Sequence, residues 1–378
     1  MRTEMDTLAQ FDDAVAAGGD LSRAVLQSLD LRHRDDALRT CRVDGALVLG
    51  CRLSEEGAQI LRAGGALLFP RLPDSPLDTY RAHLYTPIDL FDTYPTGTYE
   101  DSLDARGYAW TRGAAGEPSL DQQLAESLHD HAIAEALDDY LDMVDPVQVV
   151  GVMGGHALQR GSEGYAATAR LGMQLALAGK LVASGGGPGA MEAANLGARL
   201  APHGPQALAE ALRMLATVPR FVPSVDDWAK VAFEVKAQFS GGSDNLGIPT
   251  WFYGHEPPNV FASQIAKFCS NALREDILLK RCRGGLVYLP GAAGTVQELF
   301  QAVTGNYYAE DPSTITPLVL VGVEQWTRTL PAWPLLSSLA AGKPMADAIR
   351  LVDTVEEAGE YLVSRAARRE GLPGRANG

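Results

Sequence analysis

The sequence predicts an α/β fold built on a parallel sheet, and three observations support this prediction. From about Val147 onward, short apolar runs alternate with segments of helical periodicity, as expected for parallel strands joined by crossover helices. Two of these apolar runs lead directly into a turn of small residues and then a helix. The 378 residues, 46% hydrophobic and 21% charged, are also enough to bury a large core.

The N-terminal region, residues 1–145, is expected to form an additional α+β domain of unassigned role. Gly45–Cys51 and Gly64–Pro70 are apolar runs bounded by turn residues and predict strands. The segment 85–118 is rich in Pro, Gly, Thr, Asp and Tyr, which favours loops. Leucines at helical spacing predict a helix over Ser119–Met143. No internal repeat is evident.

The main domain, residues 146–345, is predicted to be a Rossmann-like, doubly wound parallel sheet. Residues 346–378 are expected to form a C-terminal helix, Val355–Arg368, and a tail. The predicted strands of the sheet are Val147–Met153, Leu181–Ser184, Ile248–Tyr253, Gly285–Leu289 and, closing it, Leu318–Val323. The predicted helices are Glu163–Ala178, Asn259–Arg281 and two that begin at Ala190 and Thr295.

Composition limits the partners of the chain. A formal net charge of −15 opposes binding to nucleic acid polymers or to an anionic membrane. No run of about eighteen apolar residues is present, and the N-terminus lacks the features of a signal peptide, so a cytoplasmic location is expected. The four cysteines form no CxxC pair and have no histidine at zinc spacing, so we expect no metal site.

The first glycine-rich turn, from Ser184 to Glu192, lies between a predicted strand and a predicted helix. Glycines allow close approach of a ligand to the backbone, and the free amides and dipole of a helix N-terminus attract an anion. A tight strand-to-helix turn without a ligand would have the same sequence features. The candidate phosphate- or nucleotide-binding residues here are Ser184, Gly185, Gly186, Gly187, Gly189, Met191 and Glu192.

The second turn follows the predicted strand Gly285–Leu289 and has the same design. Thr295 can donate its hydroxyl to a phosphate or cap the helix, and Glu298 lies one helical turn further on. Two such turns at the carboxyl ends of strands in one sheet are expected to meet in the crevice where open α/β folds bind ligands. The candidate binding residues of this turn are Pro290, Gly291, Ala292, Ala293, Gly294 and Thr295.

Two known motifs offer alternative interpretations of these turns. Gly185, Gly187 and Ala190 match G-x-G-x-x-A, the dinucleotide fingerprint of oxidoreductases. That fingerprint normally precedes an acidic residue at the end of the next strand, whereas the stretch following Ala201 is helical or loop. Neither turn is a P-loop, because no lysine follows Gly294.

Taken together, the two turns resemble the LOG family of lysine-decarboxylase-like proteins. The hallmark PGGxGTxxE corresponds to PGAAGTVQE at Pro290–Glu298, and a GGGPGxMEA-like segment lies at Gly185–Ala193. Gly154-Gly155-His156 and the His255–Asn259 segment HEPPN are similar to segments of the longer bacterial pyrimidine/purine nucleotide nucleosidases. The resemblance covers about residues 147–323. It implies a nucleoside 5′-monophosphate phosphoribohydrolase, acting on AMP, GMP or pyrimidine equivalents, without pyridoxal phosphate or another cofactor.

The resemblance also implies roles for individual residues. Glu298 and Arg274 correspond to the catalytic pair, and Gly154 and Gly155 join the nucleotide-binding residues. Candidate base or ribose contacts are His156, His255 and Asn259, although each histidine could equally be a solvated loop residue and Asn259 a helix cap. A homodimer or higher homo-oligomer is expected from the family.

Three departures from the family pattern are present. Ala292 replaces the second glycine of PGG, Gln297 replaces an acidic residue often found beside the catalytic glutamate, and Glu275 stands where smaller members have lysine. Such changes could alter substrate preference or mark a protein that binds nucleotide without cleaving it. The alternatives to a nucleosidase are therefore a non-catalytic nucleotide sensor and, on a similar fold, a nucleotide-sugar or dinucleotide enzyme.

Overall fold

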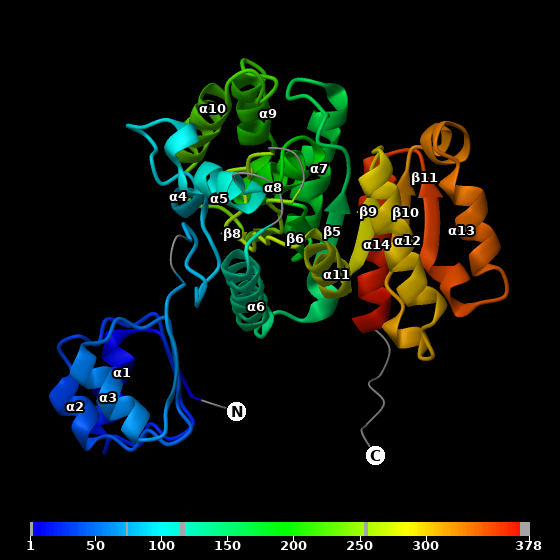
Figure 1. Ribbon diagram of the computed structural model, residues 1–378. Coiled ribbons are helices and arrows are strands. Elements are labelled where there is room, and N and C mark those ends of the chain that lie inside the picture. Colours follow the sequence, from blue (N-terminus) through cyan, green and yellow to red (C-terminus); the bar gives the residue numbers. More distant parts are fainter. Residues whose placement is uncertain (1–2, 73–74, 114–117, 253–255, 371–378) are drawn as a thin grey trace. The chain divides into compact units, whose positions relative to one another are not determined.

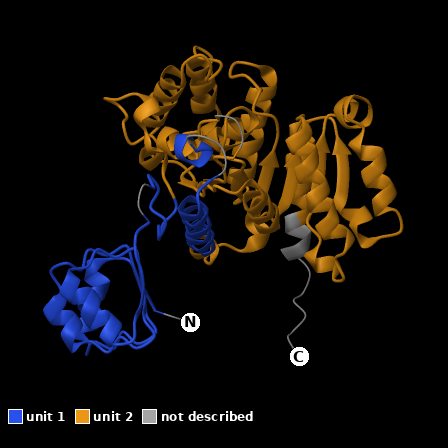
Figure 2. Ribbon diagram, viewed as in Figure 1, with its two compact units in different colours: residues 1–84, 109–138 blue, residues 85–108, 139–378 orange. Residues whose placement is uncertain are grey.

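The computed structural model describes residues 3–72, 75–113, 118–252 and 256–370 (Figure 1). The chain divides into two compact units, one of residues 1–84 and 109–138 and the other of residues 85–108 and 139–378 (Figure 2). Both contain parallel sheets, as predicted for the main α/β domain. The N-terminal region differs from the α+β domain expected there, because its strands are parallel and alternate with helices. Among the described helices, none combines the length and apolarity that a membrane span needs.

The first unit contains a four-stranded parallel sheet in which strands alternate with helices. The strands are β1 (Glu4–Met5), β2 (Val25–Gln27), β3 (Leu47–Leu49) and β4 (Leu67–Phe69), and the intervening helices are α1 (Leu8–Ala16), α2 (Asp35–Thr40) and α3 (Glu55–Ala63). The same unit holds most of α6 (Leu120–Leu141), the helix predicted over Ser119–Met143.

This sheet is built from a structural repeat that sequence inspection missed. Val25, Leu47 and Leu67 lie side by side in register, and each follows a buried alanine. Of the intervening helices, α1 and α3 have 9 residues each and α2 has 6. These strands and helices enclose a separate hydrophobic core.

The second unit is a seven-stranded parallel sheet in the order β11-β10-β9-β5-β6-β7-β8 (Figure 1). Its strands are β5 (Val149–Met153), β6 (Leu181–Ser184), β7 (Asn245–Gly247), β8 (Gln264–Ile265), β9 (Gly285–Tyr288), β10 (Leu318–Val321) and β11 (Ile349–Val352). Strand order reverses between β5 and β9, as in a doubly wound Rossmann-like fold, and ligands bind such sheets where the order reverses.

Helices cover both faces of this sheet (Figure 1). They are α7 (Glu163–Leu177), α8 (Ala190–Leu200), α9 (Gly204–Leu215), α10 (Val225–Gln238), α11 (Asn271–Arg281), α12 (Ala293–Tyr307), α13 (Ala332–Ala340) and α14 (Val355–Glu370). Apolar residues of α7, α8 and α14 pack on the central strands to form the main core. The apolar strands are buried throughout because helices lie on both sides.

Four sequence expectations are corrected by the structure. The segment 85–118 is not only loop, since it contains α4 (Pro87–Leu90) and α5 (Leu103–Arg112). In place of the strand expected at Ile248–Tyr253, β7 ends at Gly247; Pro249, which has no amide hydrogen, interrupts the ladder before a single bridge pairs Thr250 with Phe268, and Tyr253 lies outside the described residues. The helix expected from Asn259 begins only at Asn271, where Ser270 caps it, and β8 occupies part of the preceding segment. Finally, β11 rather than β10 ends the sheet on that side.

Candidate active site

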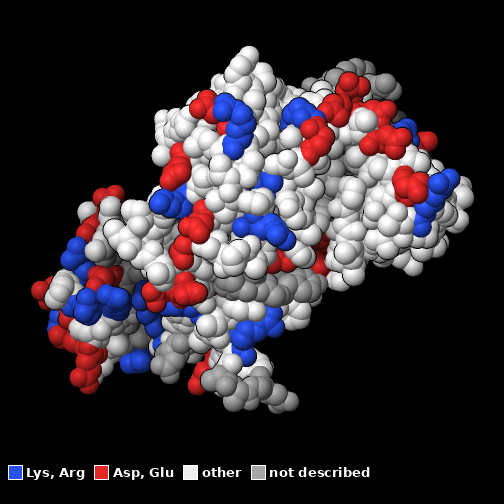
Figure 3. All heavy atoms as spheres, turned by 90° about the horizontal axis from the view of Figure 1, so that it is seen from above, with Lys and Arg blue, Asp and Glu red and all other residues white. Residues whose placement is uncertain are grey.

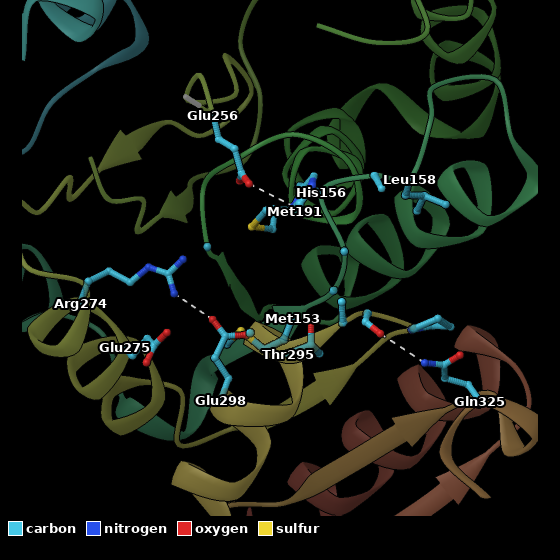
Figure 4. Close-up of a pocket in the computed structure, with 18 residues that line it drawn as sticks. Met153, His156, Leu158, Met191, Glu256, Arg274, Glu275, Thr295, Glu298 and Gln325 are labelled. Atoms are coloured by element: carbon cyan, nitrogen blue, oxygen red, sulfur yellow. Dashed lines mark hydrogen bonds and ion pairs between the residues drawn. The ribbon is translucent and has the colours of Figure 1, made fainter. Parts of the chain in front are cut away.

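A cavity of about 530 Å³ lies at the carboxyl ends of β5, β6 and β9 (Figure 4). These three strands are neighbours in the sheet, with β5 in the middle. The cavity thus lies at the point where strand order reverses, and the two glycine turns flank it from either side of β5. The residues singled out from the sequence that line it are Gly154, Gly155, His156, Gly185, Met191, Arg274, Pro290, Gly291, Ala292, Gly294, Thr295 and Glu298.

The second turn presents a helix N-terminus to the cavity. Helix α12 begins at Ala293, and no side chain caps its first turn. The Thr295 hydroxyl group is therefore not used as a cap, and its side chain fills the space where a Cβ on Gly291 would lie. Uncapped amides at the positive end of a helix are a favourable site for an anion. Gln325, which sequence inspection did not select, donates a 3.3 Å hydrogen bond to the Gly291 carbonyl and steadies this turn.

The first turn is held by its own hydrogen bonds. Gly186 has a φ of +71°, and its amide donates to Ser184 Oγ over 3.0 Å. Asn259 Nδ2 donates to the Gly187 carbonyl over 3.2 Å and to Asn195 Oδ1 over 3.0 Å. Asn259 is fully buried and also accepts from the two backbone amides of Phe261 and Ala262, so its side chain holds the loop together and caps no helix. Of this turn, Gly185 and Met191 line the cavity.

Several residues proposed as nucleotide contacts lie elsewhere. Glu192 is fully buried and forms an ion pair with Arg160, with Arg160 Nε donating to Glu192 Oε2 over 3.0 Å. A buried charge needs a partner of opposite charge, and Arg160 and Glu192 are partners for each other. The proposed residues that do not line the cavity are Ser184, Gly186, Gly187, Gly189, Glu192, Ala293 and Asn259. His255 lies outside the described residues.

Arg274 and Glu298 form the central ion pair of the cavity. Arg274 comes from α11 and Glu298 from α12, and Arg274 Nη1 donates to Glu298 Oε1 over 2.8 Å (Figure 4). Both residues are less than 10% exposed, at 8% and 9%. Burial raises the pKa of the Glu298 carboxyl, while Arg274 acts in the opposite direction. The pair therefore places a desolvated carboxylate beside a fixed cation.

Arg274 also has hydrogen-bonding capacity left for a ligand. Its Nε is buried and has no hydrogen-bond partner among the described residues. Its Nη2 comes close to the first turn, because a Cβ built on Gly185 would lie 3.2 Å from it. The same Cβ would lie 2.6 Å from Met191 Sδ, so glycine at position 185 leaves room for both side chains. Arg274 thus lies between the first turn and Glu298, on the wall of the cavity.

A second contact joins the same two helices. Glu275 is buried, and its two carboxylate oxygens accept hydrogen bonds from Asn271 Nδ2 over 2.7 Å and from Gln297 Nε2 over 2.6 Å. Glu275 and Gln297 are two of the three departures from the LOG pattern. They contact each other beside the Arg274–Glu298 pair, so the departures are structurally linked.

A second ion pair lies on another wall of the cavity. His156 Nδ1 is 3.0 Å from Glu256 Oε1 (Figure 4). Glu256 was not selected from the sequence, although it belongs to the HEPPN segment, in which His255 and Asn259 were preferred. Burial raises the pKa of the Glu256 carboxyl, and His156, Arg274 and Lys267 oppose this shift.

The positive charge available to a phosphate is local to the cavity. Over the face seen in Figure 3, basic and acidic side chains are interspersed, with no continuous basic field among the described residues. Arg274 is the one lysine or arginine among the described cavity-lining residues. An anion bound here would therefore depend on Arg274 and the α12 N-terminus.

Comparisons with known proteins bear on this part of the chain. Residues 231–362, roughly a third of the sequence, match the family described as "Possible lysine decarboxylase". No curated protein gives a significant match. A molybdenum cofactor binding protein from the phototrophic bacterium Rippkaea orientalis is similar in structure at 15% identity and a TM-score of 0.37, over 58% of this chain and 96% of that one.

A Moco carrier protein from Chlamydomonas reinhardtii is similar at 18% identity and a TM-score of 0.36, over 57% of this chain and 98% of that one.

The match to the lysine decarboxylase family begins after the first glycine turn and includes Arg274, the second turn and Glu298. It supports a lysine-decarboxylase-like, that is LOG-like, fold for this stretch.

Proposed function

We propose that this protein hydrolyses the N-glycosidic bond of nucleoside 5′-monophosphates to free base and ribose 5-phosphate. The observation that carries the proposal is the buried Arg274–Glu298 pair beside the uncapped N-terminus of α12, in one cavity. This arrangement offers an anion site and a carboxylate within the same enclosed space.

The 5′-phosphate would bind at the start of α12. Amides of the first helical turn and the Thr295 hydroxyl group would donate to phosphate oxygens. Arg274 would add a charge-assisted hydrogen bond through the donors not used by Glu298. In this pose the ribose lies over Glu298.

Glu298 would act on the sugar. As the base departs, positive charge develops on the ribose ring, and a nearby carboxylate stabilises that charge. The same carboxylate can take a proton from the attacking water. Arg274 holds Glu298 in place, so the carboxylate need not reorganise during the reaction.

The proposal is tested by incubating the protein with a panel of purine and pyrimidine nucleoside 5′-monophosphates and following free base by chromatography. We expect release by the wild type, and a loss of about a hundredfold or more in kcat for Glu298→Gln. Glu310→Gln, an exposed residue outside the cavity, is the matched control and should keep wild-type activity.

Calorimetry on the same variants separates this function from a non-catalytic sensor. Binding of nucleotide without release of any base would support the sensor and contradict the hydrolase. Absorbance of a co-purified nicotinamide or flavin would instead favour a dinucleotide enzyme.

A further inference from the structure

The hydrolysis described above leaves one proton unassigned. When the bond between C1′ and the base nitrogen breaks, its electron pair goes to the base, which leaves far more easily if it is protonated. Arg274 does not give up a proton in a protein, and Glu298 is engaged with the sugar and water. A third group must therefore face the base, and this inference rests on the proposed function.

The His156–Glu256 pair has the geometry for this task. His156 directly follows the glycine pair after β5, and its side chain is 57% exposed and lines the cavity. Glu256 engages Nδ1 of the ring over 3.0 Å, which leaves Nε2 for a ligand. Figure 4 shows this pair on a different side of the cavity from Arg274 and Glu298. A nucleotide with its sugar over Glu298 can thus extend its base toward His156.

Glu256 is placed to orient the ring. Its side chain is about a third exposed, less than that of His156. Its other carboxylate oxygen, Oε2, packs against the first turn, because a Cβ built on Gly187 would lie 3.4 Å from it. A carboxylate held against Nδ1 selects one ring orientation and stabilises the imidazolium form, as the aspartate does in a serine-protease triad.

We propose that His156 is the general acid for the departing base and that Glu256 is its positioning residue. The Nε2 proton of the imidazolium moves to a ring nitrogen or carbonyl oxygen of the base as the C1′–N bond breaks. Water adds to C1′, and its proton goes to Glu298. Proton exchange with solvent then restores both side chains.

The test compares two leaving groups on the same sugar phosphate. One substrate is AMP, or the best nucleotide of the panel, and the other is 4-nitrophenyl β-D-ribofuranoside 5-phosphate. The nitrophenolate leaves as an anion and needs no proton. His156→Gln should therefore lose about 10² to 10⁴ in kcat on the nucleotide but only a few-fold on the nitrophenyl substrate.

Further variants separate this role from a structural one. Glu298→Gln should lose activity on both substrates, and the surface variant His203→Gln should lose neither. Glu256→Gln should weaken nucleotide cleavage and shift its pH profile. The wild-type rate on nucleotides should fall on the alkaline side, where the His156–Glu256 pair no longer holds a proton to donate. The charges of Arg274 and Lys267 also act on Glu256, and they oppose the rise of its pKa. With the nitrophenyl substrate this alkaline decline should be absent.

The outcomes distinguish failure of the proposed nucleosidase function from failure of the general-acid role of His156. If the wild type releases neither base nor nitrophenol, the proposed function fails and this inference fails with it. If the wild type releases base and His156→Gln does so equally fast, only the general-acid role is overturned. Equal losses on both substrates in His156→Gln, with unchanged circular dichroism and phosphate affinity, would also overturn it.

Discussion

Gln297 Nε2 lies 2.6 Å from Glu275 Oε2, and this contact joins α12 to α11 beside the catalytic candidates. Both residues depart from the LOG pattern, which has an acidic residue near position 297 and, in smaller members, a lysine at 275. A neutral amide against a buried carboxylate avoids the repulsion that two carboxylates would cause. The two departures therefore form one compatible contact.

A double-mutant cycle tests this contact. Gln297→Glu should lower the free energy of unfolding by about 1 kcal/mol, because a carboxylate at the exposed position 297 would face the buried carboxylate of Glu275. Glu275→Lys should also destabilise, since its cation would lie beside Arg274. The double variant pairs opposite charges and should recover at least about 1 kcal/mol relative to the sum of the single changes, measured by urea denaturation. Strict additivity would contradict the coupling.

The pH dependence of catalysis should reveal the burial of Glu298. Burial raises its pKa above the ordinary value of 4.5, and Arg274 opposes the shift. Because the ionised carboxylate is the active form, kcat should fall on the acid side with a midpoint above 4.5. Arg274→Gln removes the opposing cation and should move the midpoint to higher pH. Carbon-13 NMR of the carboxyl group gives the same midpoint if the variant is too slow to assay.

Lys280→Gln is the matched control for this experiment. Lys280 lies on α11 as well, but it is 71% exposed and pairs with Asp276 at the surface. Its loss should leave the acid midpoint unchanged. An unshifted midpoint in Arg274→Gln would show that the guanidinium does not control the charge of Glu298.

Ala292→Gly should improve substrate binding without changing the fold. Ala292 has a φ of −115°, which alanine adopts without strain, so its methyl group acts only through the space it occupies on the cavity wall. Removing it should lower KM for the nucleotide by about two- to tenfold, up to about 1.4 kcal/mol, with kcat little changed. A KM that stays at the wild-type value in Ala292→Gly would refute the steric explanation.

Two glycines allow α7 and α8 to pack closely. A Cβ on Gly172 would overlap the Ala194 carbonyl, and one on Gly197 would overlap the Ala169 carbonyl. Gly197→Ala should therefore destabilise the protein by about 1–3 kcal/mol and shift α8, which begins at the first turn. A Cβ at Gly305 on α12 would meet no atom within 4 Å, so Gly305→Ala should stabilise the protein by about 0.5–1 kcal/mol. Thermal unfolding of both variants measures the contrast, and a stabilised Gly197→Ala would contradict it.

Much of the fold could be predicted because its cause is local. The apolar runs at β5, β6, β9 and β10, and the turns that follow β6 and β9, carry their own conformational preference. The helix at 103–112 and the short strand β8 were missed, because neither has a strong pattern of its own. Strand β8 is specified by pairing with β7, a contact distant in sequence.

By itself the sequence determined which segments become buried strands, where the two turns occur, and that Arg274 and Glu298 belong to helices around the second turn. Tertiary structure alone decided which turn residues face the cavity and which support it. In the folded protein Asn259 forms buried hydrogen bonds and Glu192 forms a buried ion pair with Arg160. Glu256 lies beside His156. The physical reason is that strand order and side-chain pairing depend on contacts between residues far apart in the chain. No local propensity encodes those contacts.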